Sequence, residues 1–215
     1  MSTAGRALRS PRPRRSHAER TAETRARIIA AVVDCITEVG FPRTTAAEIT
    51  RRAGVTWGAV QHHFGGKDGI LLAVLEESFG RFAARLADID AEATSLDERA
   101  SLFIDRAWDH FGSAHYRSTF EILLHSAGHG AGQSDGLWQT AMFSQWNRIW
   151  DQLFAGAGLP RRESVTLQYY TISVLSGLAA TRMLRGDSGR RPSAELELLK
   201  ATLCRELARG RGAGG

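Results

Sequence analysis

The chain has 215 residues, of which 43% are hydrophobic, so it can bury the core of one mid-sized domain or of a small and a larger one, and global disorder is excluded. No run of about 18 apolar residues occurs, which excludes a membrane-spanning helix, and no apolar segment follows the Arg-rich start, so we expect a cytoplasmic protein. The net charge of +5 is unevenly distributed along the chain. Residues 1–67 hold 12 Lys and Arg against 5 Asp and Glu, whereas residues 68–215 hold 16 against 18. This distribution indicates that the N-terminal third alone binds a polyanion.

The two ends of the chain differ in composition from the middle. Residues 1–18 are rich in Arg and Pro and lack hydrophobic periodicity, which predicts a disordered basic arm, either solvated or following phosphates. Residues 210–215 are predicted to be a flexible tail. Between them no segment repeats at a fixed period, and no strand-like alternation occurs. The sequence therefore predicts an all-α protein.

Three helices are predicted in the first third of the chain. A helical stripe of apolar residues covers 28–39 and ends at Gly40, a residue suited to a helix C-cap. A short helix over 45–52 begins at a Thr pair, and another over 56–64 begins at a Thr and stops at a Gly pair. Together they form a predicted domain over residues 19–66.

Six longer helices follow and form a second predicted domain, over residues 67–209. The sequence SLDE at 95–98 is a capping box, Pro160 opens a helix, and two Gly-rich stretches separate helices. The predicted helices cover residues 67–91, 95–111, 114–127, 136–155, 160–185 and 193–209. The chain as a whole therefore has about nine helices.

Residues 45–64 have the layout of a helix-turn-helix, with a three-residue turn at 53–55 between two short helices. On the second helix, the face opposite Val60 carries small and polar residues and no acidic group. Such a face suits the major groove of DNA, where Gly and Ala permit close backbone approach and Gln61 can reach base edges. The sequence therefore predicts a DNA-binding head.

The stretch TTAAEITRRAGVTWGAVQHHFGGKDGIL, at residues 44–71, resembles the DNA-binding domain of the tetracycline-repressor (TetR) family. The usual form of that family is TT-x-x-x-I-A-x-x-A-G-V-S-x-G-x-L-Y-x-H-F-x-x-K-x-x-L, a long motif of fixed spacing. The resemblance covers about residues 24–75, and chain length and helix count fit the family too. Gln61 departs from it, because the family has a phosphate-contacting Tyr there, and Trp57 stands where a small polar or basic residue is common. The matching positions are Thr44, Thr45, Ile49, Ala53, Gly54, Val55, Gly58, His63, Phe64, Lys67, Ile70 and Leu71.

The resemblance implies a sequence-specific DNA-binding transcriptional regulator, a ligand-responsive repressor that acts as a homodimer on a pseudo-palindromic operator. Its two recognition helices would enter successive major grooves, about 34–36 Å apart or a multiple of this. Thr45 and Lys67 are assigned to phosphates. The helical wheel favours His62 for groove contact, whereas the family pattern favours His63, and the more specific placement by the family motif decides for His63. The predicted DNA-binding residues are Thr45, Thr56, Trp57, Gly58, Ala59, Gln61, His62, His63 and Lys67.

Aromatic residues concentrate between residues 108 and 150, which hold four of the five Trp. For any single residue, core packing is the simpler interpretation. As a group, these residues lie where TetR-like proteins hold an inducer pocket, so the resemblance implies a small lipophilic effector. His110, His115, Glu121, His125 and Gln145 are candidates for polar contacts to it. The predicted ligand-binding residues are Trp108, Phe111, Tyr116, Phe120, His125, Trp138, Met142, Phe143, Trp146 and Trp150.

The last two predicted helices carry apolar or small residues on more than one face, so each must bury two sides. A four-helix bundle formed with a second chain would do this, as the family implies. In the same scheme, ligand displaces the helix predicted over 67–91 and changes the spacing of the two recognition helices. The predicted dimerisation residues are Tyr169, Ile172, Ser176, Leu196, Leu199 and Leu203.

Other classes of function are disfavoured. The chain has no Walker loop, no dinucleotide-binding Gly fingerprint and no Cys/His metal spacing, so we expect no enzyme, no cofactor and no metal. The adjacent His62 and His63 point about 100° apart on a helix, and the pair His125 and His129 lies where a helix ends. The alternatives are a helical ligand-binding or scaffold protein without DNA-regulated function, and a transcriptional activator of the same fold.

Overall fold

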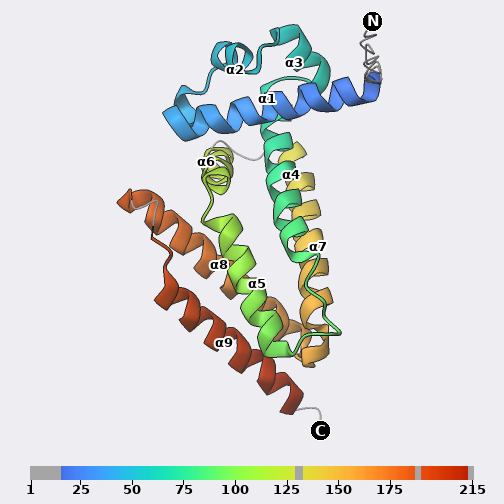
Figure 1. Ribbon diagram of the computed structural model, residues 1–215, viewed down its shortest axis with the longest axis vertical. Coiled ribbons are helices and arrows are strands. Elements are labelled where there is room, and N and C mark those ends of the chain that lie inside the picture. The colour runs from blue at the N-terminus through green and yellow to red at the C-terminus, as the bar shows by residue number, and fades with distance from the viewer. Residues whose placement is uncertain (1–15, 129–132, 187–189, 213–215) are drawn as a thin grey trace, which may run out of the picture.

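The computed structural model describes residues 16–128, 133–186 and 190–212, and within these ranges the chain is helical with no strand (Figure 1), as predicted. Two short 3-10 turns, η1 (Phe41–Arg43) and η2 (Ala155–Ala157), join some of the helices. In the described ranges no helix combines the length and the apolar character needed to cross a lipid bilayer. The α-helices are α1 (His17–Val39), α2 (Ala46–Ala53), α3 (Trp57–Phe64), α4 (Lys67–Leu86), α5 (Leu96–Phe111), α6 (Ala114–Gly128), α7 (Gln133–Phe154), α8 (Arg161–Arg185) and α9 (Ser193–Gly212).

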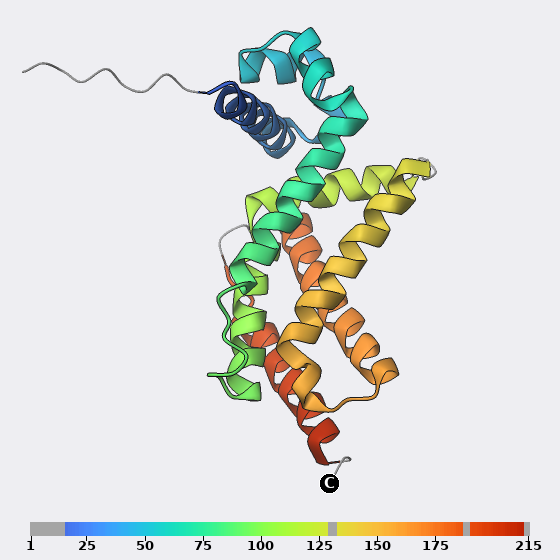
Figure 2. The same cartoon turned by 90° about the vertical axis from the view of Figure 1, so that its right-hand side faces the viewer.

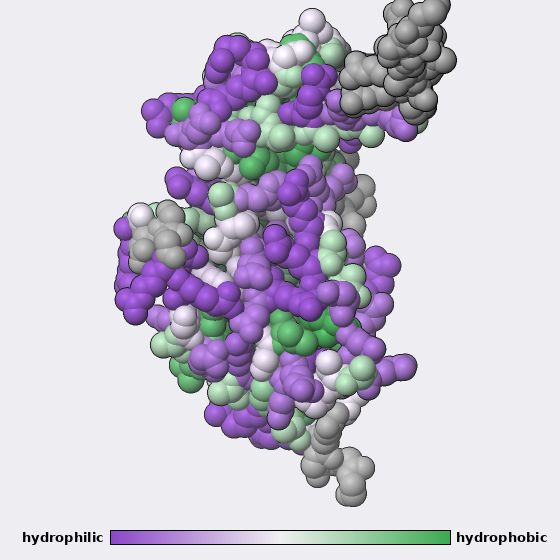
Figure 3. All heavy atoms as spheres, viewed as in Figure 1, coloured by the Kyte–Doolittle hydropathy of each residue, from purple (hydrophilic) through white to green (hydrophobic). Residues whose placement is uncertain are grey.

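The molecule is elongated, with α1, α2 and α3 forming a head at one end (Figure 1). Helix α4 leaves the head and runs into a body of helices that ends at the C-terminus, and α6 lies across the long axis directly beneath the head (Figure 2). The face shown in Figure 3 is mostly hydrophilic, with apolar side chains in small separate groups. The head and the body therefore follow one another along the long axis, and α4 and α6 join them.

Helix α1 begins at His17 because Ser16 caps it. The Ser16 hydroxyl accepts from the Glu19 amide (3.1 Å) and the Glu19 carboxylate accepts from the Ser16 amide (2.7 Å), which is a complete capping box. The helix thus starts inside the predicted arm of residues 1–18, whose first 15 residues lie outside the described ranges. Its C-cap is Gly40, at a φ of 80°, as the sequence predicts.

The two helices of the helix-turn-helix begin and end within a residue of the predicted bounds. Thr45 caps α2 and Thr56 caps α3, and both helices end at a glycine in the left-handed conformation, Gly54 (φ 64°) and Gly65 (φ 75°). Apolar side chains from α1, α2, α3 and the first turns of α4 form one core, which also includes Ile122 of α6. The head is therefore a packed unit that shares its core with the two helices beneath it.

Helix α4 ends at Leu86, five residues before the predicted end at residue 91. The chain turns there because Asp90 accepts hydrogen bonds from the amides of Glu92 (2.8 Å) and Ala93 (3.0 Å), an alternative to the helical ladder. The predicted capping box of the next helix is present, with Ser95 and Glu98 bonded to each other's amides. The same α4 contributes Val74 to the core of the head and Phe82 to the core of the body.

The structure corrects the assignment of three leucines to a dimer interface. Leu196, Leu199 and Leu203 of α9 are 1%, 2% and 0% exposed and belong to the core of the body. Helix α9 packs along α5, so the inner face of α9 is buried by the protomer itself. These side chains are therefore not available to a partner.

Candidate DNA-binding surface and ligand cavity

The two capping threonines of the head keep a donor for a phosphate. The Thr45 hydroxyl accepts from the Glu48 amide (3.3 Å), and the Thr56 hydroxyl accepts from the Ala59 amide (3.2 Å). Both side chains are exposed. A hydroxyl that accepts through its oxygen still has its own proton, so each Thr can donate to a phosphate while it caps its helix.

The exposed face of α3 carries the residues with the freest access to a groove. Gln61, His62 and Gly58 are exposed, and a Cβ built on Gly58 meets nothing closer than 3.8 Å, so this face is flat. Ala59 is half-buried, and Trp57 packs against the core of the head. The structure thus presents Gln61 and His62 outward at the middle of the helix, and it turns the Trp57 side chain partly inward.

His63 lies between the surface and the core. It is half-buried, and its ring contacts that of Phe64 at a centroid distance of 6.4 Å. Burial, followed by the neighbouring charges of His62 and Arg25, lowers the pKa of His63. His62, which the helical wheel favoured, is the more exposed of the two His.

Arg25 of α1 anchors the end of α3, and sequence reasoning missed it. Its guanidinium lies 4.4 Å from the centre of the Phe64 ring, and Nη1 donates to the carbonyl of His63. A cation at the C-terminal end of a helix is favoured by the helix dipole and by the unpaired carbonyls there. No sequence signal pointed to Arg25, because the carbonyl that it bonds is 38 residues away in the chain.

Lys67 is the first residue of α4 and is exposed, with Nζ 5.3 Å from the centre of the Phe41 ring. It follows α3 closely because α4 begins almost in contact with the end of α3. A Cβ built on Gly69 would lie 1.8 Å from the Phe64 carbonyl oxygen, so only glycine fits there. This close approach fixes Lys67 beside the end of α3.

Two of the arginines in the head are already paired. Glu48 of α2 accepts from Arg51 (2.6 Å) and from Arg52 (2.6 Å), and Arg52 also bonds Glu38 of α1 (2.7 Å). Hydrogen bonds from Arg51 and Arg52 lower the pKa of Glu48 to about 2. This network ties α2 to α1 and offsets part of the positive charge that the sequence places in the head.

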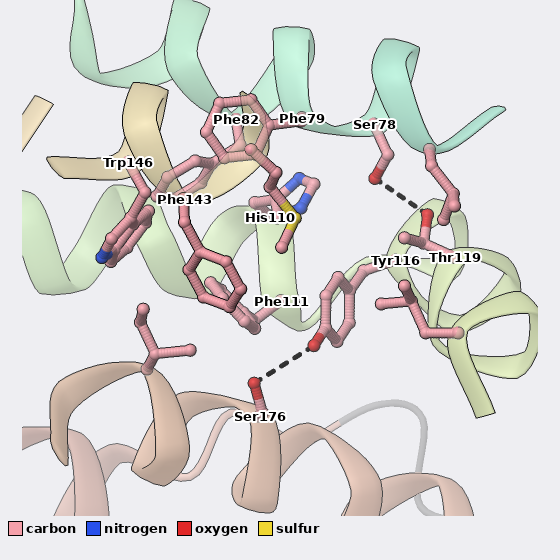
Figure 4. A pocket seen from close by; sticks show the side chains of 14 residues that line it. Ser78, Phe79, Phe82, His110, Phe111, Tyr116, Thr119, Phe143, Trp146 and Ser176 are labelled. Carbon is pink, nitrogen blue, oxygen red and sulfur yellow. Dashed lines mark hydrogen bonds between the residues drawn. The ribbon is translucent and has the colours of Figure 1, made fainter. Parts of the chain in front are cut away.

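A cavity of about 210 Å³ lies in the body next to the head (Figure 4). Five helices, α4 to α8, contribute side chains to it. Figure 4 shows aromatic rings over most of the wall, together with two hydrogen-bonded polar pairs, Ser78 with Thr119 and Tyr116 with Ser176. The lining residues are Leu75, Ser78, Phe79, Phe82, His110, Phe111, Tyr116, Thr119, Leu123, Met142, Phe143, Trp146, Ile172 and Ser176.

Five of the predicted ligand-binding residues line this cavity: Phe111, Tyr116, Met142, Phe143 and Trp146. Trp108 and Trp150 are 3% and 2% exposed and are packed in the core of the body, as the simpler interpretation had it, and Phe120 packs against that core. His125 instead contacts the ring of Phe41, at a centroid distance of 4.5 Å. The side chain of Trp138 lies outside the described residues.

The cavity also has walls that sequence reasoning did not find. Helix α4 supplies four of its lining residues, from Leu75 to Phe82, although the apolar stripe of that helix was visible in the sequence. Ile172 and Ser176 of α8, predicted to contact a partner chain, also line the cavity. Both are half-buried in the protomer, so their contact with a partner stays a prediction, and Tyr169, which is 51% exposed, is the most exposed of the predicted dimerisation residues.

The polar groups of the cavity are uncharged. Tyr116 and Ser176 share a hydrogen bond of 3.2 Å, and Thr119 donates to Ser78 at 2.8 Å (Figure 4). Burial, followed by the charges of His115 and Arg85, lowers the pKa of His110 to about 4, so its imidazole is neutral at pH 7. Among the described residues, no cluster of three or more His, Cys, Asp or Glu is arranged to hold a metal ion.

Helix α6 bonds the cavity wall to the head. The hydroxyls of Ser118 and Thr37 are 3.1 Å apart, and Ser118 also lies 3.2 Å from the Val33 carbonyl of α1. One turn further along, the Glu121 carboxylate accepts from the Phe41 amide at 2.9 Å. The helix that carries Tyr116 and Thr119 into the cavity is therefore bonded to α1 and η1 of the head.

Comparison with known proteins agrees with the family resemblance of the head. Residues 28–74 match the profile of the family described as bacterial regulatory proteins, tetR family. The HTH-type transcriptional regulator CymR of Pseudomonas putida is 27% identical over 183 residues, which are 82% of this chain and 88% of CymR. The HTH-type regulator TtgW, also of Pseudomonas putida and itself uncharacterized, is 39% identical over 95 residues, 44% of this chain but only 62% of TtgW.

Among solved structures, the transcriptional regulator FadR from Bacillus subtilis, in complex with stearoyl-CoA, superposes with a TM-score of 0.64. The two sequences are 18% identical, and the match covers 86% of this chain and 98% of FadR. At this identity the likeness shows a shared fold along nearly the whole of both chains.

Proposed function

We propose that this chain, which belongs to the TetR family of bacterial regulatory proteins and so regulates transcription by binding DNA, is a ligand-responsive repressor that acts as a homodimer on a pseudo-palindromic operator. The observation that carries the proposal is α6. Three of its side chains line the cavity (Tyr116, Thr119 and Leu123), and three others contact the head (Ser118, Glu121 and Ile122).

Operator recognition is assigned to α3 and the residues around it. Gln61 and His62 are proposed to meet base edges, since both are exposed on the flat face around Gly58. Thr45, Thr56 and Lys67 are proposed to contact phosphates and so to set the register of the helix in the groove. The Arg-rich arm, whose first 15 residues lie outside the described ranges, is left without an assigned contact.

Two helices can transmit ligand binding to the head. Helix α4 carries Leu75 and Phe79 at the cavity and Val74 in the core of the head, and α6 is hydrogen-bonded to α1. A ligand that moves either helix therefore changes the position of α3. A coupling of about 1–3 kcal/mol would change operator affinity roughly 5- to 150-fold.

The dimer interface is proposed to use the outer face of α8 rather than the leucines assigned to it from sequence. Tyr170, Gly177 and Leu184 are spaced seven residues apart, so they share one face of the helix. All three are exposed, and nothing lies within 4 Å of a Cβ built on Gly177. Leu198 of α9, 69% exposed, adds an apolar group. A second copy packed there would cover these side chains.

Selection of bound sites from random DNA by the purified protein tests the proposed function. The expected result is an inverted repeat whose half-sites are about one helical turn apart, or a multiple of it. Recovery of single half-sites without a spacing preference would contradict the homodimer, and recovery of no preferred sequence would contradict operator recognition.

A further inference from the structure

We infer that the cavity takes an uncharged, ring-sized molecule that carries a single hydroxyl or carbonyl group, such as an alkyl-substituted phenol. Carboxylates, and ligands as large as an acyl-CoA, are rejected. This inference rests on the proposed function in so far as the cavity is taken to be the effector site. It names the ligand class, which neither the family nor the fold determines.

The volume of the cavity limits the part of a ligand that the protein can bury. Pockets that hold drug-sized ligands have volumes of roughly 300–1,000 Å³, whereas a dry apolar cavity of about 150 Å³ in another protein holds benzene. The volume of about 210 Å³ found here lies between these cases, nearer the smaller one. It has room for one ring with a few substituent atoms.

The wall determines the charge of the ligand. Among the described lining residues there is no Asp, Glu, Lys or Arg, and the one titratable imidazole, that of His110, is neutral at pH 7. A carboxylate buried here would lose its hydration without gaining an ion pair, and this cost is large. An uncharged ligand avoids that cost.

The aromatic end of the cavity is shaped for a ring. Phe82 stacks on Trp146 at a centroid distance of 4.9 Å with 22° between the ring planes, and Phe111 lies edge-on to Phe82 at 6.0 Å. Offset and edge-on arrangements of this kind extend readily to one more ring. A flat or cyclic hydrocarbon therefore gains more contact area here than a flexible chain.

The polar side of the cavity supplies one adaptable hydrogen-bonding site. Tyr116 and Ser176 share a hydrogen bond of 3.2 Å, long for two hydroxyl groups, so it is readily exchanged for a bond to a ligand. The Tyr116 side chain points from α6 toward α8 across the cavity (Figure 4). A ligand hydroxyl or carbonyl at this position would be held between a donor and an acceptor.

Isothermal titration of the full-length protein at pH 7.5 tests the inference with four probes: 4-ethylphenol, ethylbenzene, 4-ethylbenzoate and decanoyl-CoA. We expect 4-ethylphenol to bind once per protomer, ethylbenzene more weakly, and both 4-ethylbenzoate and decanoyl-CoA at least tenfold more weakly than 4-ethylphenol. Tighter binding of the benzoate or of the acyl-CoA overturns the inference, and so does failure of both neutral probes to bind.

The substitution Tyr116→Phe tests whether Tyr116 makes the polar contact to the ligand. It should weaken the binding of 4-ethylphenol about 3- to 10-fold, the effect of one hydrogen bond, while ethylbenzene binds as before. Thr24→Val, which removes a hydroxyl group from α1 outside the lining of the cavity, is the matched control and should change neither affinity. Equal loss of both neutral probes in Tyr116→Phe would mean a packing defect and contradict the assigned contact.

Ligand class and regulation can fail separately. If 4-ethylphenol binds as expected but leaves operator affinity unchanged, the ligand class stands and the ligand-responsive repressor is contradicted. If the benzoate binds instead and releases the operator, the repressor stands and the ligand class is wrong.

Discussion

The carboxylate of Glu121 accepts a hydrogen bond from the backbone amide of Phe41 at 2.9 Å, which links the helix lining the cavity to the first turn after α1. The same carboxylate accepts from Arg117 on its own helix, at 3.3 Å. The hydrogen bond depends on the position of α6, because Glu121 can accept from the Phe41 amide only while α6 lies against the head. The cavity and the head therefore share an element, α6, through which the proposed ligand and operator sites are connected.

Replacement of Glu121 should weaken the link between the two sites. In Glu121→Ala, we expect ligand to bind normally, while its effect on operator affinity falls by about 0.5–2 kcal/mol, the usual size of a coupling mutation. Glu121→Gln keeps an acceptor oxygen and should retain part of the effect. Fluorescence anisotropy with labelled operator, with and without ligand, measures both. Glu195→Ala, at an exposed site on α9, is the control, and an unaltered ligand effect in Glu121→Ala would exclude this path.

Glycine at position 69 is required by the close approach of α4 to α3. In Gly69→Ala, the added Cβ would meet the Phe64 carbonyl oxygen at 1.8 Å, so backbone must shift, and we expect a loss of about 1–3 kcal/mol in the free energy of unfolding. Gly80 lies on the same helix with nothing within 4 Å, so Gly80→Ala should stabilise by roughly 0.5–1 kcal/mol. Urea denaturation followed by circular dichroism measures both. Similar effects of the same sign would contradict the packing described.

Lys67 is expected to bind DNA without regard to sequence. Lys67→Ala should weaken binding by about the same factor on every operator variant and lower the slope of log affinity against log salt by roughly 1. Titrations at several salt concentrations measure this slope. A changed base preference with an unchanged slope would remove Lys67 from the phosphate contacts.

Gln61 is expected to read a base. Gln61→Ala should relax the preference at one position of each half-site, with a loss of discrimination of about 1–3 kcal/mol there and little change elsewhere. Comparison of sites selected by wild type and variant detects it. If the two selections are identical and only overall affinity falls, Gln61 contacts the backbone, as the family Tyr does.

The buried imidazole of His110 should make the free energy of unfolding depend on pH. The unfolded chain binds a proton at this side chain near pH 6.5, whereas burial in the folded chain lowers the pKa to about 4. The unfolded state therefore gains protons first, so stability is greatest above pH 6.5 and falls as pH drops toward 4, by up to roughly 3 kcal/mol. His110→Gln removes this contribution. Denaturation at pH 7.5 and pH 5 should show a smaller drop in the variant than in wild type, and an equal drop would contradict the buried neutral imidazole.

Local features of the fold followed from the sequence more reliably than distant ones. Thr45, Thr56 and Ser95 cap helices where their neighbours in sequence indicate, since a cap depends on three or four adjacent residues. The end of α4 was misplaced, because the turn around Asp90 competes with a helix that the hydrophobic pattern alone would extend.

The site was harder to predict because an apolar pattern indicates that a residue is buried but not which helix or chain buries it. Leu196 and its neighbours on α9 form an apolar stripe, but nothing in that stripe tells whether α5 of the same protomer or a second chain covers it. Likewise Trp150 and Tyr116 are both buried aromatics, yet only Tyr116 borders the cavity. The short helices of the head were placed correctly because capping residues and glycines mark both of their ends.

The most direct measurement of ligand-controlled repression is the affinity of the purified protein for its selected operator as 4-ethylphenol is added. If ligand in the cavity moves α4 and α6, operator affinity should fall about 5- to 150-fold. The fall should be complete at the ligand concentration that fills the cavity in calorimetry. An operator affinity that stays constant while the cavity fills would contradict the central claim that the cavity and the DNA-binding head are coupled.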